Sequence, residues 1–282
     1  MTDPLVTVSW LYHHLLEPSV RVVDVRWYLG APSRGRDEYD TSHVPGAIFL
    51  DLDRDLSAPE GDGRHPLPDA QSFAETVGAV GIGNDNHVIV YDDAAGGVAA
   101  RLWWMLHHFG HPAVSVLDGG FAAWTAAEYP VTAAVHTYEP EQFVATTRSD
   151  DLIDRDELRK RLGSVLLLDT RAPNRYEGIE EPIDPVAGHI PTALSAPYTD
   201  NVTDDGRFLD PKRLANRFHD LGVAEGHEIV AYCGSGTTAC QALLAMELAG
   251  LPSGKLYPGS WSDWSTAGYP VATGSDPGDP PP

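Results

Sequence analysis

The segment CGSGTT, which begins at Cys233, has the residue types of an anion-binding loop built around a reactive thiol. Gly234 and Gly236 permit positive φ angles or a close backbone approach, so that successive N–H groups can form a nest for an anion. A helical segment follows, and its N-terminus would add partial positive charge at the same point, where a thiolate is stabilised. Three hydroxyl side chains in the loop could donate further hydrogen bonds: Ser235, Thr237 and Thr238.

Other interpretations of the two cysteines fit less well. Cys233 could be a small buried residue that ends a strand, but the glycines and hydroxyls after it favour a reactive thiol. A cysteine phosphatase needs an arginine six positions after its cysteine, where this chain has Ala239, and the Gly-Lys-Ser/Thr triplet of a nucleotide P-loop is absent. Cys240 lies at helical spacing among apolar residues, which favours a core position over a redox role.

The charge of the chain excludes several classes of partner. Its 282 residues include 41 acidic and 19 basic side chains, for a formal net charge of −22. Nucleic acid binding needs lysine and arginine to replace phosphate counterions, and an anionic membrane surface repels so acidic a protein. A small anionic substrate would need a locally positive site.

The cysteine content and the apolar segments indicate where the protein works. Two cysteines are too few for a disulfide framework and lack the CxxC spacing of a zinc site, so we expect free thiols, no metal and a reducing compartment. The first residues lack a basic region followed by an apolar run, and no apolar stretch approaches the ~18 residues of a membrane span. We therefore expect a cytoplasmic protein.

The chain also contains an internal repeat with a nearly constant offset. Four segments of the first half recur in the same order in the second: VVDVRW with LLLDTR, SHVPGAIFLD with GHIPTALSAP, HVIVYDD with EIVAYCG, and LDGGFAAW with YPGSWSDW. Such a repeat predicts two domains of one fold, over residues 1–135 and 150–274. The Gly/Pro-rich residues 275–282 are expected to be a disordered tail.

Each copy alternates short apolar runs with helical segments. In the second copy, SVLLLD, HEIVAYC and KLYPG are typical of buried strands, and two helices are expected to end at Gly222 and Gly250. This order predicts an α/β fold with a mainly parallel sheet flanked by helices on both faces. Ligands bind beyond the carboxyl ends of the strands of such sheets, and Cys233 ends one of the expected strands.

Together these motifs resemble the tandem-domain rhodanese family, which includes the thiosulfate and 3-mercaptopyruvate sulfurtransferases. The resemblance covers about residues 5–272 and is carried by GHIPTALSAP, CGSGTT followed by AC, LYPGSWSDW, and the first-copy SHVPGAIFLDLD and LDGGFAAW. It implies two rhodanese-like domains and a ping-pong reaction without metal or organic cofactor. The Cys233 thiolate would take a sulfane sulfur from a small anionic donor as a persulfide. Cyanide, a thiol or a thioredoxin-like protein would then accept the sulfur.

In the first copy, the position of Cys233 is occupied by Asp92, which cannot carry sulfur. We therefore expect the first domain to lack a catalytic cysteine and Asp92 to be a turn or cap residue. Two further pairs occur in both copies and are expected to be structural for that reason: His43 with His189, and Asp24 with Asp169.

The resemblance also implies residues that bind and activate the donor. The family grips the donor anion with an arginine soon after the D-x-R strand, the place of Arg175, while Arg171 is expected to be structural. In the 3-mercaptopyruvate enzymes a serine two residues after the cysteine works with an aspartate and a nearby histidine. These align with Ser235, Asp53 and His65, for which a polar network between the domains is the alternative.

Two features give opposite indications of the donor. Gly234 and Ser235 are neutral where the thiosulfate enzymes carry cations, which favours the monocarboxylate 3-mercaptopyruvate. However, the segment GIEEPIDPVAGHI has no basic residue, although the 3-mercaptopyruvate enzymes usually have a second arginine there. The alternatives are a main activity as a thiosulfate:cyanide sulfurtransferase and a non-catalytic rhodanese-like interaction protein, which the intact cysteine loop disfavours.

Overall fold

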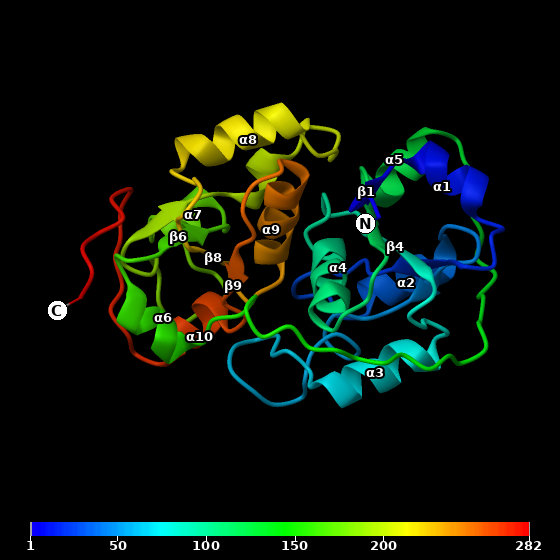
Figure 1. Ribbon diagram of the computed structural model, residues 1–282, viewed down its shortest axis with the longest axis horizontal. Coiled ribbons are helices and arrows are strands. Elements are labelled where there is room, and N and C mark those ends of the chain that lie inside the picture. Colours follow the sequence, from blue (N-terminus) through cyan, green and yellow to red (C-terminus); the bar gives the residue numbers. More distant parts are fainter. Residues whose placement is uncertain (1, 282) are drawn as a thin grey trace. The chain divides into compact units, whose positions relative to one another are not determined.

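The computed structural model describes residues 2–281 and divides the chain into two compact units (Figure 1). Unit 1 comprises the described residues of Met1–Pro59, Leu67–Arg148 and Val202–Phe208, and unit 2 comprises those of Glu60–Pro66, Ser149–Asn201 and Leu209–Pro282. Two short segments, Glu60–Pro66 and Val202–Phe208, therefore belong to the unit opposite to that of their sequence neighbours. Residues 275–281, in the expected tail, form no helix or strand, and the Pro277 carbonyl accepts a hydrogen bond from Thr192 N–H at 2.6 Å.

Unit 1 is built on a five-stranded sheet in the order β1-β5-β4-β2-β3, with all pairs parallel. Its strands are β1 (Leu5–Val6), β2 (Val20–Asp24), β3 (Ile48–Phe49), β4 (His87–Tyr91) and β5 (Val114–Leu117). Its helices are α1 (Val8–His14), α2 (Arg34–Thr41), α3 (Ala70–Ala79), α4 (Ala99–His108) and α5 (Gly120–Ala126). Ile89 and Tyr91 share a core with α1, α2 and α5, whereas α4 packs against β4 and β5 on the opposite face. Because both faces of the sheet are covered, all five residues of β2 are buried, and so are the last four of β4.

Unit 2 has a four-stranded parallel sheet in the order β7-β6-β8-β9. Its strands are β6 (Leu166–Asp169), β7 (Ala193–Ser195), β8 (Ile229–Tyr232) and β9 (Lys255–Leu256). Its helices are α6 (Arg155–Arg161), α7 (Pro173–Tyr176), the 3-10 helix η1 (Tyr198–Asn201), α8 (Pro211–Asp220), α9 (Thr238–Leu248) and α10 (Ser260–Thr266). Val230 and Tyr232 share a core with α6, α7 and α10, and α9 packs against β8 and β9. The predicted α/β class with parallel sheets flanked by helices is confirmed.

The expected ends of two helices of unit 2 are confirmed as well. Helix α8 stops one residue before its C-cap Leu221, and Gly222 follows with φ of 87°. Helix α9 ends at Leu248, and Gly250 has φ of 68°. A left-handed residue just beyond a helix directs the chain away from the helix axis, and glycine adopts it at the lowest cost.

The residue pairs that recur in both copies make the same contacts in each unit. His43 stacks on the Tyr39 ring and His189 on the Tyr176 ring, and both histidines are fully buried. The buried Asp169 pairs with Arg171 at 2.6 Å, as Asp24 pairs with its own neighbouring arginine. These contacts lie inside the turns and strand ends of each unit, which supports the structural role expected for them.

Candidate active site

Cys233 follows directly after β8, at the carboxyl end of the sheet of unit 2. Its side chain is buried, with 2% of the residue surface exposed. Its N–H donates to Ser260 Oγ at 3.1 Å, and its carbonyl accepts from Trp261 N–H at 2.9 Å. The Gly234 carbonyl accepts a further bond from Ser262 N–H at 2.9 Å. The first turn of α10 therefore holds the backbone at Cys233 in place.

Ser260 adopts a backbone conformation that serine rarely takes, with φ of 54°. A non-glycine residue in the left-handed region costs on the order of 1 kcal/mol. In unit 1 the residue at the start of α5 is Gly120, with φ of 57°. The hydrogen bond from Cys233 N–H to Ser260 Oγ is a physical reason for a serine in unit 2, because glycine at this position could not accept it.

The two glycines of the loop serve different purposes. Gly236 has φ of 74°, so it uses the left-handed conformation that the sequence suggests. Gly234 does not have a positive φ; instead, a Cβ atom there would lie 3.1 Å from Arg64 Nη2 and 3.5 Å from Arg175 Nη1. Gly234 is thus the point at which two guanidinium groups approach the backbone next to Cys233.

Unit 1 shows what the corresponding loop does when an aspartate replaces the cysteine. The Asp92 carboxylate, 1% exposed, accepts four backbone hydrogen bonds of 2.8–3.0 Å, from the N–H groups of Ala94, Gly96, Val98 and Ala99. Asp92 therefore caps its own loop. The loop after β4 is an anion-binding nest, and the carboxylate of Asp92 fills it.

Replacing Asp92 with alanine is expected to lower the free energy of unfolding by about 2–4 kcal/mol, because four buried N–H donors would lose their acceptor. Denaturant unfolding of the purified variant measures this change. Asp85→Ala is the matched control, since Asp85 is an exposed carboxylate of the same unit. Equal stability of the two variants would show that water replaces the carboxylate at no cost.

The structure brings Ser235 and His65 together in unit 2. Ser235 Oγ lies 2.7 Å from His65 Nδ1, and both residues are buried. Thr237 Oγ1 lies 3.4 Å from the same nitrogen, while Thr238 Oγ1 lies 3.5 Å from Thr170 Oγ1. His65 reaches this place because its segment, Glu60–Pro66, packs with unit 2.

Asp53 lies within unit 1. The Trp27 indole N–H donates to Asp53 Oδ2 at 2.7 Å, and the Asp53 N–H donates to Asp51 Oδ1 at 2.9 Å. The first contact holds the carboxylate of Asp53 and the second holds its backbone in the turn after β3. Its cooperation with Ser235 stays a prediction.

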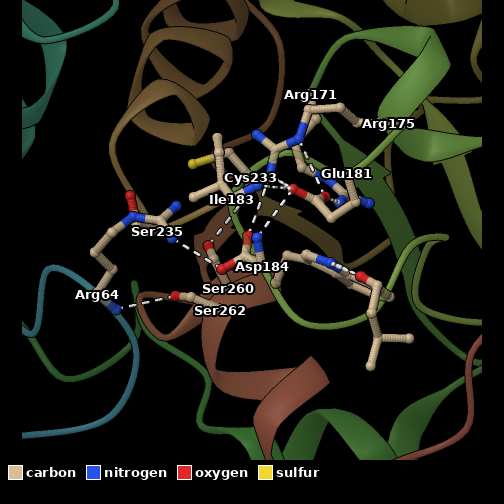
Figure 2. A network of polar contacts seen from close by, with 12 residues as sticks. Arg64, Arg171, Arg175, Glu181, Ile183, Asp184, Cys233, Ser235, Ser260 and Ser262 are labelled. Carbon is tan, nitrogen blue, oxygen red and sulfur yellow. Dashed lines mark hydrogen bonds and ion pairs between the residues drawn. The ribbon is translucent and has the colours of Figure 1, made fainter. Parts of the chain in front are cut away.

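Arg171 anchors a network of arginines and carboxylates beside the cysteine loop (Figure 2). Its Nη2 binds the fully buried Asp169 carboxylate at 2.6 Å and the Gly188 carbonyl at 2.6 Å. Burial alone would lower the pKa of Arg171, but the charge of Asp169 raises it, so the guanidinium stays charged. Arg171 also contacts Glu181 at 3.3 Å. Its position supports the structural role expected for it.

Arg175 and Arg64 both bind acidic residues of the segment that precedes GHIP. Arg175 donates two hydrogen bonds to Glu181, at 3.1 and 2.7 Å, and one to Asp184 at 3.1 Å. Arg64 Nη1 donates to the other oxygen of Asp184 at 2.8 Å. Figure 2 shows the two arginines approaching Asp184 from different segments of the chain, near Cys233.

Arg64 is the cation of this network that the sequence analysis missed. The segment before GHIP has no arginine, but the structure brings Arg64 to the network from a loop that is remote in sequence. The available signal was its position in GRHPLP, directly before His65.

Cys240 lies inside α9, with none of its surface exposed. Its Sγ donates to the Gly236 carbonyl at 3.3 Å, which is a contact with the backbone of the cysteine loop. The two cysteines are both free thiols. This environment supports a core position for Cys240.

Comparison with known proteins gives consistent matches along most of the chain. The family model described as a rhodanese-like domain matches twice, at residues 7–127 and 154–267. A probable 3-mercaptopyruvate sulfurtransferase of Pseudomonas aeruginosa is 48% identical over 278 residues, covering 96% of this chain and 98% of that protein. A thiosulfate sulfurtransferase of Mus musculus is 39% identical, covering 92% of this chain and 91% of that protein. The crystal structure of SseA from Escherichia coli, described as a 3-mercaptopyruvate sulfotransferase, is 30% identical, with a TM-score of 0.83 over 93% of this chain and 100% of that one.

Proposed function

Because the chain belongs to the rhodanese family, with two rhodanese-like domains, we propose that it is a sulfurtransferase in which Cys233 carries sulfur as a persulfide. The observation that carries the proposal is the place of Cys233, at the carboxyl end of β8 and next to the glycine that two guanidinium groups approach. The second domain, residues 150–274, would carry sulfur. The first, residues 1–135, would not, because Asp92 fills its own nest.

The reaction takes place in two nucleophilic steps. The Cys233 thiolate attacks the terminal sulfur of the donor, and a new sulfur–sulfur bond forms. With 3-mercaptopyruvate the carbon–sulfur bond breaks, its electron pair stays on carbon, and the resulting enolate takes up a proton to give pyruvate. With thiosulfate the sulfur–sulfur bond breaks and sulfite leaves. A nucleophilic acceptor then attacks the outer sulfur and releases the Cys233 thiolate.

The neighbouring residues have roles that follow from their contacts. Ser235 and His65 form a hydrogen-bonded pair that can hold or move the proton exchanged with the donor, with Asp53 as the third proposed member. Arg175 would bind the donor anion. The remaining loop residues would surround the thiolate, the persulfide and the donor: Gly234, Gly236, Thr237 and Thr238.

The donor is a small anion, 3-mercaptopyruvate or thiosulfate, and the acceptor a thiol, a thioredoxin-like protein or, in an assay, cyanide. The neutral loop residues Gly234 and Ser235 favour 3-mercaptopyruvate; the alternative is thiosulfate as the main donor. We place the reaction in the cytoplasm, because Cys233 and Cys240 are both free thiols. None of the described helices is long and apolar enough to cross a membrane. The similarity to sulfurtransferases speaks against the alternative, a non-catalytic interaction protein, and the following experiment tests it directly.

Treatment with either donor is expected to add about 32 Da, one sulfur atom, to Cys233, and cyanide should remove it. Intact mass spectrometry detects the adduct, and peptide mapping assigns it to one of the two cysteines. If neither 3-mercaptopyruvate nor thiosulfate produced an adduct on Cys233, the proposed function would be wrong.

A further inference from the structure

Arg64 presents one edge of its guanidinium group to the backbone next to Cys233. Its ion pair with Asp184 uses Nη1, at 2.8 Å. Its Nε is buried and has no hydrogen-bond partner among the described residues. Its Nη2 would lie 3.1 Å from a Cβ atom on Gly234. The Nε and Nη2 donors form the side of a guanidinium that can bind a carboxylate with two parallel hydrogen bonds, so a buried donor without a partner here indicates a place for an anion.

Arg64 is held in this position by its backbone and by Asp184. Its own N–H donates to Ser262 Oγ at 3.0 Å, in the same turn of α10 that holds Cys233. The Asp184 side chain is 4% exposed and binds Arg64 through one oxygen and Arg175 through the other. A buried carboxylate shared by two guanidinium groups aligns both of them on the same side of the loop. This fixed arrangement lowers the cost of ordering two long side chains when a ligand binds.

The charges of the network are balanced before any donor binds. Arg171 is matched by Asp169, and the pair Arg64 and Arg175 faces the buried pair Glu181 and Asp184. A donor with one negative charge therefore adds a single unbalanced charge, while the thiosulfate dianion adds two. Inside a partly buried site each added negative charge is repelled by the two carboxylates, which disfavours the dianion.

We propose that Arg64 is a donor-binding residue that completes a two-arginine clamp with Arg175. We propose further that Asp184, which both arginines bind, biases this clamp toward singly charged carboxylate donors. The inference rests on the proposed sulfur transfer at Cys233, whose donor-binding part it specifies. Arg64 would also supply the second cation that the segment before GHIP lacks.

The variant Arg64→Gln is expected to lower kcat/KM for 3-mercaptopyruvate by about 10- to 100-fold, mainly through a higher KM. Arg64→Lys should lose less, because it keeps the charge but not the paired donors. Arg213→Gln removes one exposed positive charge elsewhere in unit 2 and should stay within about twofold of the wild type. A KM for Arg64→Gln within about twofold of the wild-type value would overturn the role of Arg64.

The variant Asp184→Asn tests the charge bias, because it preserves the shape of the side chain and removes one negative charge. We expect the ratio of kcat/KM for thiosulfate to that for 3-mercaptopyruvate to rise at least about fivefold. An unchanged or lower ratio would contradict the bias. Thermal denaturation of the same samples establishes that each variant is folded.

A binding measurement separates this inference from the sulfur-transfer proposal. Calorimetry of pyruvate with Cys233→Ser, and with Cys233→Ser combined with Arg64→Gln, measures carboxylate binding without sulfur transfer. We expect the second variant to bind pyruvate at least about tenfold more weakly. Equal binding would reject the clamp even if the persulfide forms, whereas weaker binding without any persulfide would retain the clamp and reject the sulfur carrier.

Discussion

Replacing Cys233 with serine is expected to abolish sulfur transfer from both donors, with kcat lowered at least about 10³-fold. A serine hydroxyl is not ionised near neutral pH and cannot hold a sulfane sulfur as a persulfide. The substitution should leave the fold unchanged, because the backbone bonds to Ser260 and Trp261 do not involve the thiol. Steady-state assays with cyanide as acceptor, and the mass of the donor-treated protein, measure the effect.

Cys240→Ser is the matched control for this experiment. Cys240 is also a buried free thiol, and its side chain contacts the Gly236 carbonyl of the same loop. A serine hydroxyl can donate to that carbonyl in its place, so most of the turnover should remain. If both variants lost activity equally, Cys240 would have a part in the chemistry, and the core position assigned to it would be insufficient.

Replacing Arg175 with glutamine is expected to lower kcat/KM for both donors at least about 100-fold. Arg175 binds Glu181 with two hydrogen bonds and Asp184 with one. Its loss therefore removes a cation that would bind the sulfur donor, and it leaves two buried carboxylates with one partner fewer. The free energy of unfolding should fall by about 1–3 kcal/mol for the same reason. The expected loss exceeds that of Arg64→Gln because Arg64 binds only one of these carboxylates.

Assays with each donor and denaturant unfolding test this prediction, again with Arg213→Gln as the control for a lost surface charge. Arg175→Lys should recover part of the activity but not the paired hydrogen bonds to Glu181. Wild-type kcat/KM for both donors in Arg175→Gln would contradict a role in donor binding and assign Arg175 to the network alone.

Much of the fold could be read from local patterns. A continuous apolar run that ends at Cys233 predicted β8, because both faces of a parallel strand are covered. The glycines at 222 and 250 predicted two helix ends, because a left-handed turn favours glycine. The recurrence of four segments in order predicted two copies of one parallel α/β fold. Each of these patterns depends on a few residues that are close in sequence.

The site was only partly predictable for a different reason. The sequence could nominate Ser235 and His65, but the 2.7 Å contact between them depends on the path of Glu60–Pro66, which packs with unit 2. The loop after Asp92 could be expected to turn, but not to fold four N–H groups around its own carboxylate. Such hydrogen bonds depend on how the chain packs in three dimensions, and no local sequence pattern indicates them.

The sequence by itself determined that Cys233 lies at the end of a strand of the second repeat and begins a glycine-rich loop, because an apolar run and the content of glycine and hydroxyl residues are local properties. Only the tertiary structure decided which cations approach that loop. The segment before GHIP supplies the acids Glu181 and Asp184, and the second arginine beside them is Arg64, from a loop 120 residues before Asp184 in the chain. A long charged side chain can reach a site from any segment that passes nearby. Which arginine reaches the loop is therefore decided by the fold of the chain and not by a sequence motif.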